Sequence, residues 1–316
     1  MTLQPAFDFE RQGLDFLWLE VTKKCNLECL HCYAESSPQA PLLQRMTYDD
    51  WRRTLQQAWV LGCRKVQFIG GEPTLYPRLP DLIEEARGIG YEFIEVFTNG
   101  TTLSDPLLDT FKRCAVRVAF SFYGPSADVH EQVTTRTGSF ERTLGNIRKA
   151  VNLGLPVRVG IIAMGLNAGR VQETRALLNG LGVTSVRVDR VRGIGRGGAL
   201  SPNPDQQEEL CGACWRGKLC ITADGSVFPC VFARFCRVGD ARCGLDAVNE
   251  STELNQFRRQ MRKDQGGGQA CDPESEDCAP GCEPKPGVDY CHPDYSKDDP
   301  CEPSARHCYP NTPCHP

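Results

Sequence analysis

Residues 25–32 read Cys-Asn-Leu-Glu-Cys-Leu-His-Cys and place three thiols within eight positions, spaced C-x3-C-x2-C. They follow an apolar run, residues 16–21, that predicts a buried strand. A strand that opens into a loop of thiols is a typical place for a metal site. Three sulfurs are one short of the usual four, so either a fourth ligand comes from elsewhere or one metal position is open to a substrate. An open position is typical of catalytic sites.

Two plainer interpretations of this stretch have to be considered. A structural zinc ion could be bound by the three thiols together with His31. His31 is the immediate neighbour of Cys32, however, and tetrahedral closure by both side chains is awkward. Disulfide bonds would leave one of the three thiols over, and the rest of the chain has the composition of a cytosolic protein. We therefore favour a metal site with an open position.

A second motif follows the next predicted strand: Gly70-Gly71-Glu72-Pro73 comes directly after the apolar run 66–69. The two motifs together resemble those of the radical S-adenosylmethionine (SAM) enzymes. In that family an aromatic residue or His precedes the last Cys, as His31 does here. A GGEP loop at the end of the second strand contacts the amino group of SAM. The resemblance covers roughly residues 14–200.

The resemblance implies a function for the three thiols. Cys25, Cys29 and Cys32 would bind three irons of a [4Fe-4S] cluster, and SAM would bind the fourth. One electron, from a flavodoxin- or ferredoxin-type donor, would cleave SAM to methionine and a 5′-deoxyadenosyl radical. That radical takes a hydrogen atom from an unactivated C–H bond. The cofactor supplies the reactivity, and the protein supplies placement and exclusion of water.

Polar residues at later predicted strand ends are further candidates for SAM contacts. By the resemblance, Asn99 and Ser121 match positions that touch the SAM ribose and methionyl carboxylate. Relatives often have Asp where this chain has Tyr123, so an acid/base role of that Asp does not carry over. Arg190 and Arg192 end the sixth predicted strand, where one could pair with a carboxylate of SAM or substrate. The alternative for both arginines is a solvated strand end.

Apolar runs alternate with amphipathic segments as far as residue 191 and predict an α/β fold. Parallel neighbours need helical crossovers of this length, so the strands should form a parallel sheet. Six units are too few for an eight-stranded barrel, and the residues alone equally allow a doubly wound sheet. The resemblance implies a partial (β/α)6 barrel with a small cysteine-rich C-terminal extension. The predicted strands are 15–21, 65–69, 92–98, 115–122, 157–164 and 185–191. The predicted helices are 48–61, 79–87, 105–113, one opening at 139, and 167–181.

A glycine-rich stretch, residues 193–198, matches G-x-G-x-x-G. No helix follows it directly, so we reject dinucleotide binding. We expect a flexible loop beside the mouth of the active site.

A second group of cysteines begins after the linker-like segment 201–204. Residues 221–230 predict a hairpin with Asp224-Gly225 at its turn. The spacing from Cys214 through Gly225 to Cys230, C-x10-G-x4-C, resembles the start of a SPASM or twitch extension, which binds an auxiliary iron-sulfur cluster. The alternative is a four-thiolate zinc site. The candidate ligands are Cys211, Cys214, Cys230 and Cys236.

The tail, residues 265–316, is rich in cysteine, proline and acidic residues and poor in apolar ones. Such a segment cannot build its own core, so we expect it to be disordered or wrapped around metal. Cys271, Cys278 and Cys282 are spaced C-x6-C-x3-C, one residue longer than the C-x5-C-x3-C of the related extension. They are candidate ligands of a second auxiliary cluster. A disordered, metal-scavenging tail is the alternative.

Composition and charge set further limits. With 316 residues, of which 40% are hydrophobic and 24% charged, the chain can bury a sizeable core. A net charge of −4 argues against nucleic acid as a partner. We find no membrane span and no secretory signal, and expect a cytoplasmic protein. The expected parts are a lead-in (1–13), the barrel (14–200), the auxiliary-cluster domain (201–264) and the tail (265–316).

The resemblance to auxiliary-cluster enzymes also suggests a substrate. Many of them act on peptides, so our first hypothesis is maturation of a ribosomally made precursor peptide by a thioether or carbon–carbon crosslink. The first strand begins near residue 15, so we expect a separate protein, or the tail, to bind the leader peptide. The alternatives are oxidation of a small molecule, such as a sugar alcohol in antibiotic biosynthesis, and an iron-sulfur carrier. The GGEP motif argues against a carrier, which needs no loop for the SAM amine.

Overall fold

One continuous sheet of nine strands runs through residues 13–264, the part of the chain that the computed structural model describes. The strand order is β6-β5-β4-β3-β2-β1-β7-β8-β9, so the first six strands are added one after another from the centre to one edge. The strands are β1 (Phe16–Glu20), β2 (Lys65–Ile69), β3 (Phe93–Thr98), β4 (Arg117–Ser121), β5 (Val157–Ala163), β6 (Ser185–Arg190), β7 (Lys218–Thr222), β8 (Ser226–Phe228) and β9 (Gly239–Asp240).

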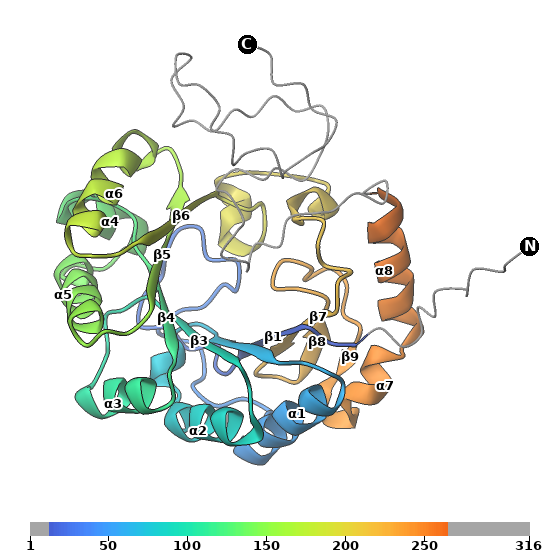
Figure 1. Ribbon diagram of the computed structural model, residues 1–316. Helices are drawn as coiled ribbons and strands as arrows, with labels where there is room; N and C mark the ends of the chain where they lie inside the picture. Colours follow the sequence, from blue (N-terminus) through green and yellow to red (C-terminus); the bar gives the residue numbers. More distant parts are fainter. Residues whose placement is uncertain (1–12, 265–316) are drawn as a thin grey trace, which may run out of the picture.

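Strands β1 to β6 are all parallel, and helices connect them. Figure 1 shows α1, α2, α3 and α5 along the outer side of the curved sheet, while the loop after β1 lies on its inner side. The predicted α/β partial barrel is therefore confirmed. The helices are α1 (Tyr48–Val60), α2 (Leu79–Ile89), α3 (Asp105–Arg113), α4 (Ala127–Thr134), α5 (Ser139–Asn152), α6 (Val171–Gly180), α7 (Leu245–Asn249) and α8 (Thr252–Asp264).

Strands β1 to β4 are buried on both faces for most of their length, which explains why they read as near-continuous apolar runs. On β1, Leu17 and Leu19 belong to the core under the outer helices. Phe16 and Trp18 point the other way, because side chains alternate along a strand. Their partners on the inner side include buried cysteines of the second group. The segment that carries the second cysteine group thus packs against the inner face of the barrel.

The hairpin predicted at 221–230 is present as β7 and β8, which begin and end a few residues earlier, with Gly225 at its turn in a left-handed conformation. The sequence did not predict that β7 pairs in parallel with β1, where Cys220 lies opposite Trp18. The sheet therefore crosses the expected boundary at 200/201 without interruption. The division into a barrel and an auxiliary domain stays a prediction.

Three helix predictions need correction. Gly88 does not end the second helix: it lies within α2, and Gly90 forms the left-handed C-cap with φ 115°. The helix predicted from residue 167 begins later: a 3-10 turn at Ala168–Arg170 precedes α6, and the Asn167 side chain binds the Met164 backbone amide and the Tyr123 carbonyl. Helix α4 was missed because its eight residues are too few for a clear period. No helix within residues 13–264 is long and apolar enough to cross a bilayer.

A buried polar network joins three strands on the inner face. Glu95 on β3 is 1% exposed, and both its carboxylate oxygens accept hydrogen bonds from Arg158 on β5, at 2.8 and 2.6 Å. Gln67 on β2 donates to the same carboxylate. Because these groups are shielded from water, removing one partner leaves the others poorly satisfied.

We therefore expect Glu95→Ala to lower the free energy of unfolding by about 3 kcal/mol. The control is Glu84→Ala, which removes an ion pair to Arg113 whose side chains are 49% and 59% exposed. Its cost should stay within about 1 kcal/mol. Urea unfolding followed by circular dichroism measures both variants, and equal losses would contradict the network's importance.

Candidate metal and cofactor site

The loop of the first three cysteines leaves the C-terminal end of β1. Cys25 is buried, and Cys29 and Cys32 are partly buried. Neighbouring segments fix the loop backbone: the Cys25 amide donates to Ser37 O at 3.1 Å, and the Leu30 amide to Val133 O at 3.1 Å. The cysteine loop thus has a defined course at the edge where parallel α/β barrels place their active sites.

The Gly70–Gly71 turn packs directly on the chain that leads into Cys25. Gly71 N donates to Thr22 O at 2.8 Å, and Glu72 N donates to Lys24 O at 2.9 Å. A Cβ atom on Gly70 would lie 2.5 Å from Thr22 O, and one on Gly71 would lie 2.3 Å from Lys24 O. No side chain fits at either position. Both positions are glycine because the backbone of the turn lies directly against the backbone of residues 22–24.

The carboxylate of Glu72 is fully buried, and both of its oxygens accept hydrogen bonds from other residues of the protein. One oxygen accepts hydrogen bonds from Thr74 Oγ1 at 2.7 Å and Thr98 Oγ1 at 2.6 Å, and the other from the Asn99 amide at 2.7 Å. Burial raises the pKa of Glu72, and these hydrogen bonds act against that rise. Glu72 therefore ties the end of β2 to the end of β3. Its predicted contact with SAM stays a prediction.

Asn99 connects this turn to the cysteine loop. Its Nδ2 donates to Asn26 Oδ1 at 2.8 Å and lies 3.7 Å from the sulfur of Cys25. Burial, and next the Glu72 carboxylate, raise the pKa of Cys25 to about 12. The free thiol is therefore protonated at neutral pH, and a bound metal would have to displace that proton. The structure brings Cys25, Glu72 and Asn99 together, as the sequence predicted for one site.

The glycine-rich stretch also lies at the site, but it is packed rather than free. Arg196 donates from its backbone to Cys32 O at 3.1 Å, and from its guanidinium to Cys29 O and Ser36 O, both at 2.8 Å. A Cβ atom on Gly195 would lie 2.5 Å from Tyr33 O. The expectation of a flexible loop is corrected: this stretch clamps the cysteine loop.

Tyr123 lies beside the cysteine loop, between the partly buried His31 and the buried His130. Its ring centroid is 4.9 Å from that of His31 and 5.5 Å from that of His130. Its phenol shares a hydrogen bond with Ser121. Burial lowers the pKa of both histidines to about 4, with the Arg196 charge adding to the effect at His31. Both rings are therefore neutral. His130 was not predicted from the sequence, because it lies on α4, the helix that was missed.

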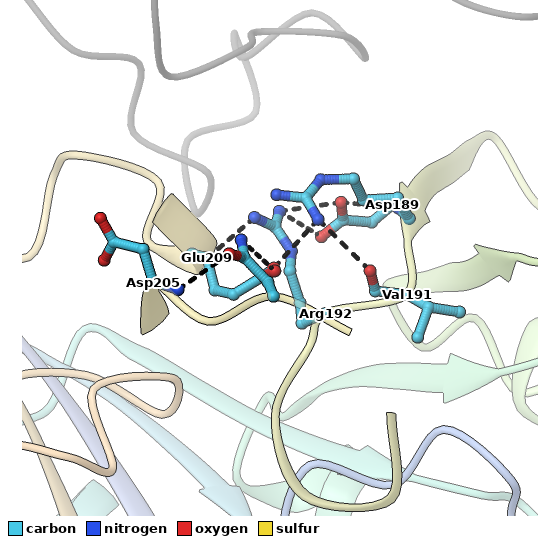
Figure 2. Close-up of polar contacts among 7 residues, drawn as sticks. Asp189, Val191, Arg192, Asp205 and Glu209 are labelled. Atoms are coloured by element: carbon cyan, nitrogen blue, oxygen red, sulfur yellow. Dashed lines mark hydrogen bonds and ion pairs between the residues drawn. The ribbon is translucent and has the colours of Figure 1, made fainter. Parts of the chain in front are cut away.

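Arg190 and Arg192 hold the next segment of the chain in place (Figure 2). Arg190 pairs with the buried Glu209 at 2.9 Å. Arg192 binds both carboxylate oxygens of Asp189 at 2.8 Å and also donates to the Glu209 carbonyl at 2.9 Å. The solvated strand end that we considered is therefore wrong for Arg192, whose side chain is 14% exposed. A contact of either arginine with a SAM carboxylate stays a prediction.

The predicted ligands of the second cysteine group lie in or against one buried cluster, and their role as metal ligands stays a prediction. The sulfurs of Cys214 and Cys230 are 3.2 Å apart, and Cys211 is hydrogen-bonded to Cys214. That bond, and then nearby cations, lower the pKa of Cys211 to about 6. Burial, and next the Glu253 carboxylate of α8, raise the pKa of Cys236. Cys271, Cys278 and Cys282 lie outside the described residues.

Residues 19–178 match the family model of the radical SAM superfamily, and this match spans half of the chain. The protein therefore belongs to the radical SAM superfamily, as its two motifs suggested.

Among curated relatives, the chain is 28% identical over 193 residues to the antilisterial bacteriocin subtilosin biosynthesis protein AlbA of Bacillus subtilis, covering 60% of this chain and 42% of AlbA. It is 30% identical over 200 residues to the PqqA peptide cyclase of Gluconobacter oxydans, covering 61% and 55%. A GTP 3′,8-cyclase of Desulforamulus reducens is 29% identical over 164 residues, covering 51% and 50%. The chain thus spans about half the length of the curated relatives it matches.

Solved structures show the same fold. Streptococcus suis SuiB bound to S-adenosylmethionine superposes with a TM-score of 0.66 at 14% identity, covering 78% of this chain and 68% of SuiB. The enzyme anSMEcpe with bound AdoMet gives a TM-score of 0.61 at 17% identity, covering 78% and 79%. At identities of 14% and 17%, these superpositions show a shared fold alone.

The described residues fit the cofactors that the family implies, SAM and a [4Fe-4S] cluster. Three thiols of one loop face a turn without side chains, and the Nδ1 atom of the neighbouring His31 is buried without a hydrogen-bond partner. Within residues 13–264, no three His, Cys, Asp or Glu side chains form a ready site for a single metal ion. A cluster needs sulfurs spread over separate irons, so its ligands stand further apart than those of one ion.

The clamp on the cysteine loop can be tested with two adjacent glycines. A Cβ atom on Gly197 would lie 2.2 Å from Arg192 O, whereas one on Gly198 meets only Gly193 O, at 3.5 Å. We expect Gly197→Ala to lower the free energy of unfolding by about 1–3 kcal/mol and to reduce the iron retained after reconstitution. Gly198→Ala should match the parent chain in both measurements. A Gly197→Ala protein with unchanged stability and iron would show that the clamp is not needed.

Proposed function

We propose that this protein is a radical SAM enzyme that modifies a peptide. The observation that carries the proposal is the meeting of the three-thiol loop with the Gly70–Gly71 turn at the carboxyl edge of β1 and β2. With SAM and a reduced cluster bound, such a site supplies a 5′-deoxyadenosyl radical. The thiols would bind the cluster, and the turn would offer backbone groups to the SAM amine.

The surrounding residues are suited to keeping water from this chemistry. Tyr123, Val133, Met164 and Val191 form a small buried cluster of their own beside the cysteine loop. Burial raises the pKa of Tyr123 well above its usual value, and the nearby thiols, foremost Cys29, act in the same direction. The phenol therefore stays protonated. A dry wall of neutral groups protects a reactive radical from side reactions.

A peptide is the substrate that the relatives favour. Two of the curated relatives carry names that refer to a bacteriocin, subtilosin, and to a peptide, PqqA, and SuiB has been solved bound to its precursor peptide SuiA. We propose that this chain likewise acts on a precursor peptide, forming a thioether or carbon–carbon crosslink. A flavodoxin- or ferredoxin-type donor, a separate leader-binding protein and one or two auxiliary clusters of the SPASM or twitch kind belong to the same proposal.

Oxidation of a small molecule is the second candidate. The structure of BtrN in complex with AdoMet and 2-DOIA covers 82% of this chain and 91% of BtrN, with a TM-score of 0.51 at 17% identity. This chain thus matches nearly the whole of BtrN, whereas it matches 68% of SuiB. An assay with both kinds of substrate separates the two candidates.

The first prediction concerns SAM cleavage. Anaerobic, reconstituted protein with dithionite and SAM should release 5′-deoxyadenosine, measured by liquid chromatography. Cys29→Ala should lose this product, because one iron of the cluster would lack its ligand. The control is Cys63→Ala, which removes a buried thiol outside both cysteine groups. An undiminished yield from Cys29→Ala would refute the assigned site.

The second prediction concerns the product. A candidate precursor peptide encoded beside the gene, incubated with the reduced protein and SAM, should lose the mass of two hydrogen atoms for each crosslink. Fragmentation should then fail between the joined residues. Unchanged peptide, together with consumption of a sugar alcohol under the same conditions, would favour the small-molecule candidate.

A further inference from the structure

Cys220 lies in the middle of β7 and points to the inner side of the barrel. It is fully buried and lies opposite Trp18 of β1 in the register of the sheet. Across the hairpin it lies opposite Phe228 of β8, two residues before Cys230. The fold therefore brings Cys220 to the same side as Cys214 and Cys230, and all three belong to one buried cluster.

Burial distinguishes Cys220 from Cys236. Cys220 is fully buried within this cluster beside Cys214 and Cys230, whereas Cys236, like Cys211, is partly buried and packs against it. Cys211 is in addition hydrogen-bonded to Cys214. Cys236 comes from the segment after the hairpin, and the charged group acting on it belongs to α8.

Arg234 supplies a cation next to Cys220. Its guanidinium is hydrogen-bonded to the Cys220 thiol and forms an ion pair with Glu20. It also donates a hydrogen bond to Val231 O at 2.8 Å. Burial raises the pKa of the Cys220 thiol, and the Arg234 charge and hydrogen bond act against that rise, so bound iron would have to displace the thiol proton. A hydrogen bond to a ligand sulfur also helps to set the potential of a cluster.

We propose that Cys220 is a ligand of the auxiliary iron-sulfur cluster, together with Cys211, Cys214 and Cys230, in place of Cys236. This inference rests on one part of the proposed function, namely that the second metal site holds an iron-sulfur cluster. Four protein thiolates make a closed site, which offers no iron to a substrate. The auxiliary cluster would then carry electrons rather than bind the peptide.

Loading such a cluster requires the sulfurs to separate. Cys214 and Cys230 are 3.2 Å apart, closer than thiolates on different irons. Cys214 and Cys230 precede and follow the hairpin strands, and rotation of their side chains can open this contact. Cys220 is fixed by the sheet on both sides and defines one corner of the site.

The experiment uses the full chain with Cys25→Ala, Cys29→Ala and Cys32→Ala, which removes the first site. Cys271→Ala, Cys278→Ala and Cys282→Ala are added to remove the predicted tail ligands, so that the iron bound reports on the second site. After anaerobic reconstitution, iron and sulfide are counted per chain, and the reduced protein is measured by electron paramagnetic resonance. In this background Cys220→Ser should lose most of its iron or show a three-iron signal. The matched control, Cys236→Ser, should keep both iron and signal.

Two results would overturn the inference: unchanged iron and signal in Cys220→Ser, or an equal loss in Cys236→Ser. The unfolding midpoint of the metal-free variants checks that each chain folds. If Cys220→Ser does not fold, Arg234→Gln gives a second readout, a midpoint potential more negative than that of the background; an unchanged potential would count against the inference. The background cannot cleave SAM, so these outcomes do not depend on whether the SAM-cleavage test succeeds.

Discussion

The site depends on the close contact between two backbones, Gly70–Gly71 and residues 22–24. This contact places the turn after β2 directly against the approach to Cys25, with hydrogen bonds of 2.8 and 2.9 Å and no room for a side chain. The Glu72 carboxylate then joins the turn to the end of β3. Three neighbouring strand ends are thereby fixed relative to the thiols before any cofactor binds. Such preorganisation is what a site for radical chemistry requires.

The sequence predicted most of the barrel because its strands are buried on both faces and its helices have clear apolar stripes. It also predicted the meeting of Cys25, Glu72 and Asn99, because the ends of parallel strands share one edge. It failed where contacts depend on tertiary packing. The parallel pairing of β7 with β1 joins residues 200 positions apart, and no local pattern encodes it. The clamp by Arg196 is equally invisible, since a glycine-rich stretch reads as flexible until its neighbours are known.

The arginines at the end of β6 show why residue type alone is a weak guide to a binding site. A cation near a strand end suits a carboxylate ligand, but the protein can supply that carboxylate itself. Here Asp189 and Glu209 do so (Figure 2). The polar network ties the end of β6 to the segment that leads into Cys211. Its structural effect is to position the second cysteine group over the inner face of the barrel.

The two cysteine groups are also joined by the buried ion pair of Glu20 and Arg234. Glu20 ends β1 just before the first cysteine loop, and Arg234 follows Cys230 and lies 5.5 Å from the ring centroid of Tyr33, the neighbour of Cys32. Burying two charges costs about as much as their attraction returns, so net stability is a poor reason for such a pair. Orientation is a better one. The pair fixes the segment that carries the second cysteine group against the loop of the first.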